Sequence, residues 1–197
     1  IGTAEHALNA YHSNETINVN KPIRYAGVSP CFRKEAGAHG KDTKGIFRIH
    51  QFEKIEQFVF CKPEDSWKEF DLILKNSEEL LKSLGIPFRF VILSSGDTGR
   101  VPTKTIDLEG WFPSQNTYRE LASCSNCLDY QARRSNTRFE EKGEMKFVHT
   151  LNNTAIATER MITCIVDNFQ QKDGSIKIPE ALQKYMNGVK VIQVVKR

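Results

Sequence analysis

The sequence predicts an α+β fold in which helices flank an antiparallel β-sheet. Three observations indicate it: extended segments follow one another along the chain, turn signals separate them, and amphipathic helical patterns stand between groups of them. Strands that follow strands pair antiparallel more readily than parallel, because parallel pairing needs a crossover connection. The expected strands are residues 22–32, 46–61, 88–93, 103–112, 118–125 and 147–151.

The first helical pattern begins at Pro63 and ends before Gly85 and Pro87, which are start and stop signals for a helix. Apolar side chains recur in it at three- and four-residue steps and predict a stripe that faces the core: Trp67, Phe70, Leu74, Leu81 and Leu84.

A second helix is expected to begin near Thr154, with an apolar stripe of Ile162, Ile165, Val166 and Phe169. Arg160 lies two residues from Ile162, which at the helical period is about 200 degrees round the axis. We therefore expect Arg160 to point away from the core.

The 197 residues are 39% hydrophobic, which suits one globular domain over residues 1–197. The formal net charge of +4 favours polyanionic partners only weakly. An odd number of cysteines without the spacing of a secreted scaffold predicts a reducing, cytoplasmic location. No apolar run approaches the roughly 20 residues that span a bilayer, so we expect no membrane partner.

Side chains within residues 46–61 alternate between two faces, with Phe52, Lys54, Glu56 and Phe58 on one and Ile49, Ile55 and Val59 on the other. Phe52 and Glu56 are about 13 Å apart at roughly 3.3 Å per residue. That separation suits an aminoacyl nucleotide whose base stacks at one end. A core phenylalanine beside a surface glutamate would give the same pattern.

Other polar side chains of the expected strands and loops suit phosphate and metal. Arg33 could bind a phosphate bidentately, and Glu35 could accept from an adenine amino group, although solvated hairpin loops also carry such residues. Asp107, Glu109 and Glu120 offer the oxygen ligands that Mg²⁺ prefers, although strand carboxylates usually face solvent.

Several other kinds of site lack their signatures. Cys124 and Cys127 have no second pair at zinc-site spacing. His50 and His149 have no hydrolase nucleophile motif around them, and structural roles are the better interpretation. A Walker-type phosphate loop and a dinucleotide-binding glycine pattern are absent from the sequence.

Taken in order, these segments resemble the active-site series of the seryl-tRNA synthetases, which belong to class II of the aminoacyl-tRNA synthetases. The resemblance runs from Gly2 to about Tyr185 and is most like the cytosolic eukaryotic-type members. Thr3-Ala4-Glu5 resembles the serine-binding Thr-x-Glu element. The segments that resemble motif 2 are 32–37 and 49–56, and the segment that resembles motif 3 is 151–160. Between them, 120–127 resembles the metal-binding segment, and 107–115 resembles the strand that leads into it.

The resemblance implies a class II synthetase-type antiparallel β-sheet flanked by helices, and a ligase that activates L-serine with ATP and Mg²⁺. It further implies transfer of serine to the 3′ end of tRNA(Ser) by a protein that is a homodimer when intact. The implied catalytic residues are Arg33, Glu120 and Arg160, and the implied Mg²⁺ ligands are Glu120 and Ser123.

The resemblance also implies which residues bind each substrate. For ATP they are Arg33, Lys34, Glu35, Ile49, His50, Gln51, Phe52, Glu120, Leu121, Ala122, Ser123 and Arg160. For serine they are Thr3, Ala4, Glu5, Arg33, Glu56, Asn152 and Thr154. In this scheme Arg33 holds the α-phosphate, Phe52 stacks on adenine, and Glu5 pairs with the serine ammonium.

Two features depart from the family pattern. Glu120 and Ser123 differ in strand parity, so we expect either a bulge between them or a backbone contribution from Ser123. The family's tRNA-binding arm and dimer-forming motif 1 would lie before Ile1, so we expect residues 1–197 alone to aminoacylate poorly.

Two other functions stay open at this point. An enzyme that loads an amino acid onto a carrier protein would use the same adenylate chemistry. A catalytically inert paralogue would keep the fold as a binding module.

Overall fold

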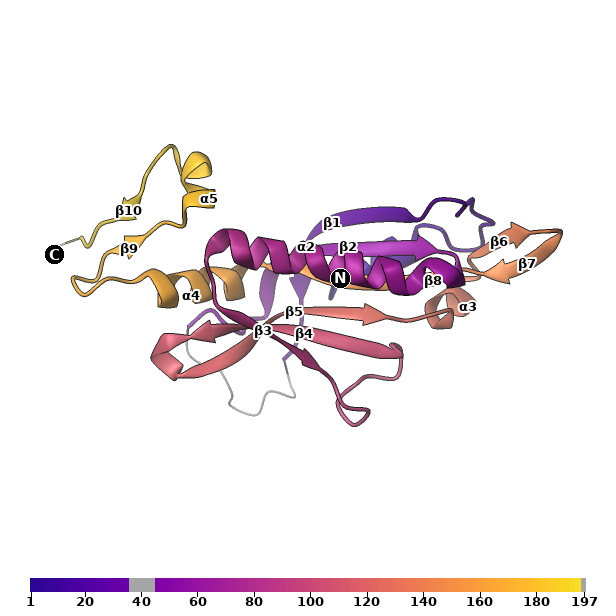
Figure 1. Ribbon diagram of the computed structural model, residues 1–197, viewed down its shortest axis with the longest axis horizontal. Coiled ribbons are helices and arrows are strands. Elements are labelled where there is room, and N and C mark those ends of the chain that lie inside the picture. The colour runs from indigo at the N-terminus through magenta and orange to yellow at the C-terminus, as the bar shows by residue number, and fades with distance from the viewer. Residues whose placement is uncertain (36–44, 196–197) are drawn as a thin grey trace.

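The computed structural model describes residues 1–35 and 45–195. Six strands form one antiparallel sheet in the order β1-β2-β8-β5-β4-β3 (Figure 1). Their bounds are Ile23–Phe32 (β1), Gln51–Cys61 (β2), Phe88–Ile92 (β3), Lys104–Phe112 (β4), Thr117–Asn126 (β5) and His149–Ala157 (β8). The predicted α+β class is confirmed, although β2 begins five residues later than predicted, at Gln51 rather than at residue 46.

Helix α2 (Ser66–Leu84) follows a short 3-10 turn, η2 (Pro63–Asp65), and ends at Gly85, whose φ of 69° suits a residue without a side chain. The predicted stripe is confirmed at Phe70, Leu81 and Leu84, which are buried. Trp67 was assigned to that stripe wrongly, since it is 47% exposed and contacts Phe70 edge-on at the end of the helix.

Helix α4 (Thr158–Phe169) begins four residues later than predicted, because the chain through Thr154 is a strand. Strand β8 lies between β2 and β5 and pairs with both. From Thr154 to Ala157 the pairing is with β2 alone, and this backbone pairing overrides the local helical signal. The buried side chains of α4 are Met161 and Cys164, whereas Ile162 is 47% exposed, so the predicted apolar stripe is displaced round the helix.

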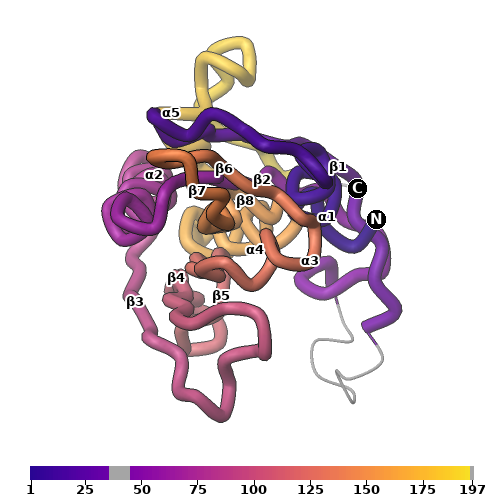
Figure 2. Tube along the Cα trace, turned by 90° about the vertical axis from the view of Figure 1, so that its right-hand side faces the viewer, coloured from indigo at the N-terminus to yellow at the C-terminus, as the bar shows by residue number. Residues whose placement is uncertain are grey.

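The remaining elements lie at the margins of the sheet. They are α1 (Ala4–Ala10), η3 (Pro113–Gln115), α3 (Tyr130–Ser135), the hairpin β6 (Arg138–Glu141) and β7 (Glu144–Phe147), β9 (Ile176–Lys177), α5 (Glu180–Gln183), η4 (Lys184–Met186) and β10 (Val191–Ile192). The C-terminal segment, yellow in Figure 2, projects on the side away from β3, β4 and β5. No helix of the described part of the chain has the length and apolarity to cross a membrane.

The two faces of the sheet have different coverings. Helix α2 contacts β2, β4, β5 and β8, and buries Val59, Leu151 and Cys124 beneath it. The opposite face carries α1 against β1 and β2, and α3 against β8. One part of that second face is apolar core, around Phe58 and Phe60, and the rest carries a lining in which polar side chains predominate.

Candidate active site

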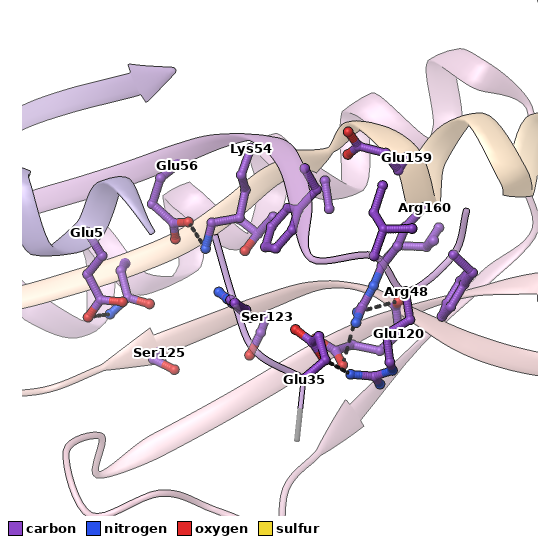
Figure 3. Close-up of a pocket in the computed structure, with 18 residues that line it drawn as sticks. Glu5, Glu35, Arg48, Lys54, Glu56, Glu120, Ser123, Ser125, Glu159 and Arg160 are labelled. Carbon is purple, nitrogen blue, oxygen red and sulfur yellow. Dashed lines mark hydrogen bonds and ion pairs between the residues drawn. The ribbon is translucent and has the colours of Figure 1, made fainter. Parts of the chain in front are cut away.

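A pocket of about 400 Å³ opens on the sheet face opposite α2. Strands β2, β5 and β8 form its floor, and α1, α4 and the segments on either side of residues 36–44 form its walls (Figure 3). The lining residues are Glu5, Arg33, Glu35, Phe47, Arg48, Ile49, Phe52, Lys54, Glu56, Glu120, Leu121, Ser123, Ser125, Asn152, Thr154, Ala157, Glu159 and Arg160.

One end of the pocket, which we call the buried end, is formed by Glu5, Lys54, Glu56, Asn152 and Thr154. The side chains of Glu56 and Lys54 are 2% and 9% exposed, and Lys54 Nζ lies 2.5 Å from Glu56 Oε2. Burial raises the pKa of Glu56, and the charge and hydrogen bond of Lys54 lower it, with a net rise.

Glu5 is held at the buried end by two side-chain amides. Its Oε1 accepts from Gln131 Nε2 at 2.6 Å and from Asn152 Nδ2 at 3.1 Å. Thr3 caps the helix that carries Glu5, and its hydroxyl donates to Glu56 Oε2 at 3.4 Å. The two carboxylates of this end are thus connected through the start of α1.

The other end, which we call the open end, is formed by Arg33, Glu35, Arg48, Glu120 and Arg160. Opposite charges pair across it: Arg48 Nη1 lies 2.6 Å from Glu35 Oε2, and Arg160 Nη1 lies 3.3 Å from Glu120 Oε2. Arg33 Nε donates to the carbonyl oxygen of Gly2 at 3.0 Å. Arg33 and Glu120 are exposed, so this end is accessible from solvent.

Two aromatic rings position the arginines of the open end. The Arg33 guanidinium carbon lies 5.1 Å from the centroid of the Phe52 ring. The buried Phe47 ring lies under Arg160 at 5.1 Å and under Arg119 at 4.1 Å. Cation–π contacts at these distances orient a guanidinium without using its hydrogen-bond donors.

A bulge in β5 resolves the parity of Glu120 and Ser123. Leu108 pairs with Ala122 and Glu109 pairs with Glu120, so Leu121 is the extra residue. Both Glu120 and Ser123 consequently line the pocket, and the predicted bulge is confirmed. Gly110 permits it, because a Cβ there would overlap the Leu121 side chain.

A second bulge lies in β8. Ile55 pairs with Ile156 and Glu56 pairs with Thr154, so Ala155 is the extra residue. Thr154 and Ala157 differ in parity and nevertheless both line the pocket. Bulges that turn side chains toward a site are common next to active sites.

The oxygen donors of β5 fit a hard divalent cation. Glu120 and Ser123 present a carboxylate and a hydroxyl on the same side of the strand. Beside Ser123, the buried Oδ1 of Asp107 has no hydrogen-bond partner among the residues that the structure describes. Mg²⁺ takes one or two such ligands and keeps several waters. Within the described residues there is no group of three or more His, Cys, Asp or Glu side chains able to hold a metal ion.

All five cysteines lie in the described part of the chain, and all are buried and free of disulfide bonds. Burial raises the pKa of the Cys127 thiol to about 12, and its Sγ accepts from Asn152 Nδ2 at 3.6 Å. Cys124 lies in the core under α2, on the other side of the sheet from the pocket.

Most residues that the sequence nominated line the pocket, but several do not. Those outside its lining are Thr3, Ala4, Lys34, His50, Gln51 and Ala122. Ala122 packs in the core on the α2 side of β5. His50 is exposed, and its Nδ1 lies 3.1 Å from the Arg33 carbonyl oxygen. Ala36 and Gly37 of the motif 2 segment lie outside the described residues.

Sequence reasoning missed six lining residues: Phe47, Arg48, Lys54, Ser125, Ala157 and Glu159. Strand parity had placed Lys54 on the face of Phe52 and Glu56, although it was not nominated as a site residue. The same parity could have found Ser125, since it lies two residues from Ser123. Glu159 accepts from the backbone N–H of Glu53 through both carboxylate oxygens, at 3.1 Å each. No sequence pattern predicts that contact.

The fold and the pocket define a class of protein. The sequence pattern of the family described as tRNA synthetase class II core domain (G, H, P, S and T) matches residues 1–169. The chain belongs to this family.

Within the class, the chain is similar to serine–tRNA ligases. It is 60% identical over 188 residues to that of Cenarchaeum symbiosum, covering 94% of this chain and 45% of that protein. It is 58% identical over 195 residues to that of Nitrosopumilus maritimus, covering 98% and 46%. The chain thus spans less than half the length of these relatives.

Solved structures give the same similarity. The seryl-tRNA synthetase of Pyrococcus horikoshii complexed with ATP has a TM-score of 0.96 and 52% identity, over 100% of this chain and 44% of that one. The cytoplasmic serine–tRNA ligase of Naegleria fowleri in complex with AMP has a TM-score of 0.93 and 50% identity, over 98% and 46%.

Proposed function

We propose that this chain forms seryl-adenylate from L-serine and ATP, and that the protein containing it transfers serine to the 3′ end of tRNA(Ser). The observation that carries the proposal is one continuous pocket with two chemically different ends on the face of β2. The buried end offers carboxylates and amides, which suit a small zwitterion with a hydroxyl. The open end offers three arginines, which suit a triphosphate.

At the open end, ATP would exchange partners with charges that now pair internally. Arg48 and Arg160 leave Glu35 and Glu120 for phosphate oxygens, and Arg33 takes the α-phosphate. Glu35 is then available to accept from the adenine amino group, and Phe52 to stack on the ring. The relatives whose structures contain ATP and AMP support this assignment.

The reaction at the centre of the pocket needs no general base. The serine carboxylate is ionised at neutral pH, and one of its oxygens attacks the α-phosphorus. The new bond joins that oxygen to phosphorus, and the bond to the β-phosphate oxygen breaks. Pyrophosphate leaves with the electron pair while the arginines stabilise the developing charge.

At the buried end, Glu5 would pair with the serine ammonium, and Glu56, with Thr154 beside it, would accept from the serine hydroxyl. Asn152 fixes Glu5 through the hydrogen bond of 3.1 Å. A buried site that is built to bind a hydroxyl rejects alanine, because its polar groups would be left unpaired.

Glu120 and Ser123 would hold Mg²⁺, which when bound neutralises phosphate charge. Asp107 is not assigned to this pair. Its buried Oδ1 lies on the neighbouring strand β4, beside Ser123.

We propose further that residues 1–197 act as one catalytic domain of a cytoplasmic homodimer. The five unpaired cysteines support a reducing compartment. The serine–tRNA ligase of N. fowleri, to which the chain is similar, is cytoplasmic.

Serine-dependent exchange between ATP and pyrophosphate tests the proposal. The intact protein is assayed with serine, threonine, alanine and glycine. We expect exchange with serine only, and serylation when tRNA(Ser) is added. Exchange that prefers glycine or alanine would overturn the serine assignment, and no exchange with any amino acid would overturn the enzyme assignment.

A further inference from the structure

Lys54 lies at the middle of the pocket floor. It is two residues from Phe52 and two from Glu56 on the same face of β2, so each lies roughly 6.6 Å away along the strand. Figure 3 shows Lys54 between the glutamates of the buried end and the charged groups of the open end. With adenine on Phe52 and the serine hydroxyl on Glu56, the two substrates meet beside Lys54.

The ammonium of Lys54 has donors available at that point. The residue is 7% exposed, and within residues 1–35 and 45–195 its Nζ has one hydrogen-bond or ion-pair partner, Glu56 Oε2. An ammonium carries three N–H donors, so two remain for a ligand. Its neighbours across the sheet are two small residues, Ser29 on β1 and Ala157 on β8.

The stability of the fold alone does not account for a lysine in the pocket floor. A buried ion pair is often no more stabilising than apolar side chains of the same volume, because both charges lose their hydration. The adjoining floor is apolar at Phe58, where the same strand face becomes core. The charge of Lys54 therefore lies in the part of this strand face that lines the polar pocket, and not in the part that forms the core.

We infer that Lys54 is a catalytic residue whose ammonium contacts the serine carboxylate and the α-phosphate as they meet. The inference rests on the proposed function. Two anions approach each other in that step, and a cation between them reduces their repulsion. Lys54 moves no proton, since the carboxylate attacks in its ionised form and the electron pair of the broken P–O bond leaves with pyrophosphate.

A different role for Lys54 would be to hold Glu56 in its ionised form. The charged groups that act on Glu56 are Lys54 on its own strand and Glu5 from α1. In that case a substitution of Lys54 would act through Glu56 alone, so its effect would vanish in a Glu56→Gln background. The two roles are therefore separable by a double-mutant cycle.

The test uses Lys54→Met, which keeps the aliphatic stem and removes the charge, in the intact protein and in the Glu56→Gln background. We expect Lys54→Met to lower kcat for adenylate formation roughly 100-fold in both backgrounds, with KM for ATP within about twofold. The double variant contains no unpaired buried charge, so it tests the role even where the single variant unfolds. Lys75→Met, on the exposed side of α2, is the matched control and should retain the wild-type rate.

A second readout does not depend on turnover. Serinamide lacks the carboxylate charge, so Lys54→Met should weaken serine binding about tenfold and leave serinamide binding unchanged. A wild-type kcat in Lys54→Met would overturn the role of Lys54 and leave the proposed function standing. So would a loss of rate that occurs when Glu56 is present and vanishes in the Glu56→Gln background. A wild-type protein without exchange would instead overturn the proposed function, and this role with it.

Discussion

The two ends of the pocket solve different recognition problems with the same residue types. At the buried end, Glu56 and Lys54 are nearly inaccessible, and amides fix Glu5. At the open end, the Glu120 side chain is 47% exposed, and the arginines are held by aromatic rings and exchangeable ion pairs.

The difference follows from the way in which each ligand is recognised. A hydroxyl is discriminated from a hydrogen only where an unpaired acceptor would be buried, so the proposed serine site needs an end of the pocket that excludes water. A triphosphate is recognised by its charge, which arginines supply without being fully buried. Substitutions should therefore change specificity at one end and rate at the other.

The largest effect is expected from Glu56→Ala. Removal of the buried acceptor should lower the preference for serine over alanine by roughly 10³-fold, as measured by ratios of kcat/KM in pyrophosphate exchange. KM for ATP should stay unchanged, because the open end is intact. Glu53→Ala, at an exposed position of the same strand, is the control. An unchanged preference in Glu56→Ala would show that the hydroxyl is recognised elsewhere.

Arg160→Ala tests the opposite end. Loss of one charged donor to the phosphates should lower kcat about 100-fold, while KM for serine and the preference over alanine stay as in the wild type. Arg134→Ala, which removes an exposed arginine of α3, should change neither kcat nor KM for serine. If Arg160→Ala altered amino-acid preference instead, the two ends could not be treated as independent.

The pH dependence should also separate the ends. Glu56 must be ionised to accept from the hydroxyl, and its pKa is raised by burial, so kcat/KM for serine should fall as pH decreases through that raised pKa. Below it the fall approaches tenfold per pH unit. Stopped assays between pH 4 and 8 would measure it. The acid limb should be absent in Glu56→Gln, and a limb that persists there would belong to another group.

Strand alternation predicted which strand residues of this site share a face, whereas the family resemblance nominated the residues outside the strands. The shared face of Phe52 and Glu56 needed only the two-residue period of a strand. The parity conflict at Glu120 and Ser123 left a bulge or a backbone contribution as alternatives, and the structure contains the bulge. Local rules were sufficient there, because the alternation of side chains between the two faces of a strand depends only on their spacing in the sequence.

Predictions that depended on tertiary pairing were wrong. A helix was predicted from Thr154 because its neighbours have helical periodicity, but pairing with β2 keeps that segment in a strand as far as Ala157. The contact of Glu159 with the Glu53 N–H joins residues 106 positions apart, which no local pattern encodes.

The smallest effect is expected from Gln131→Ala, which touches no substrate. Gln131 donates to Glu5 at 2.6 Å and is itself held by Thr150 Oγ1 at 2.6 Å, so it orients the carboxylate that we propose as the partner of the serine ammonium. Loss of this hydrogen bond, worth about 1 kcal/mol, should raise KM for serine about fivefold and leave KM for ATP unchanged. Gln171→Ala removes a hydrogen bond of 2.7 Å far from the pocket and should leave both constants unchanged. If KM for serine rose more in Gln131→Ala than in Glu56→Ala, the ammonium, and not the hydroxyl, would dominate serine recognition at the buried end.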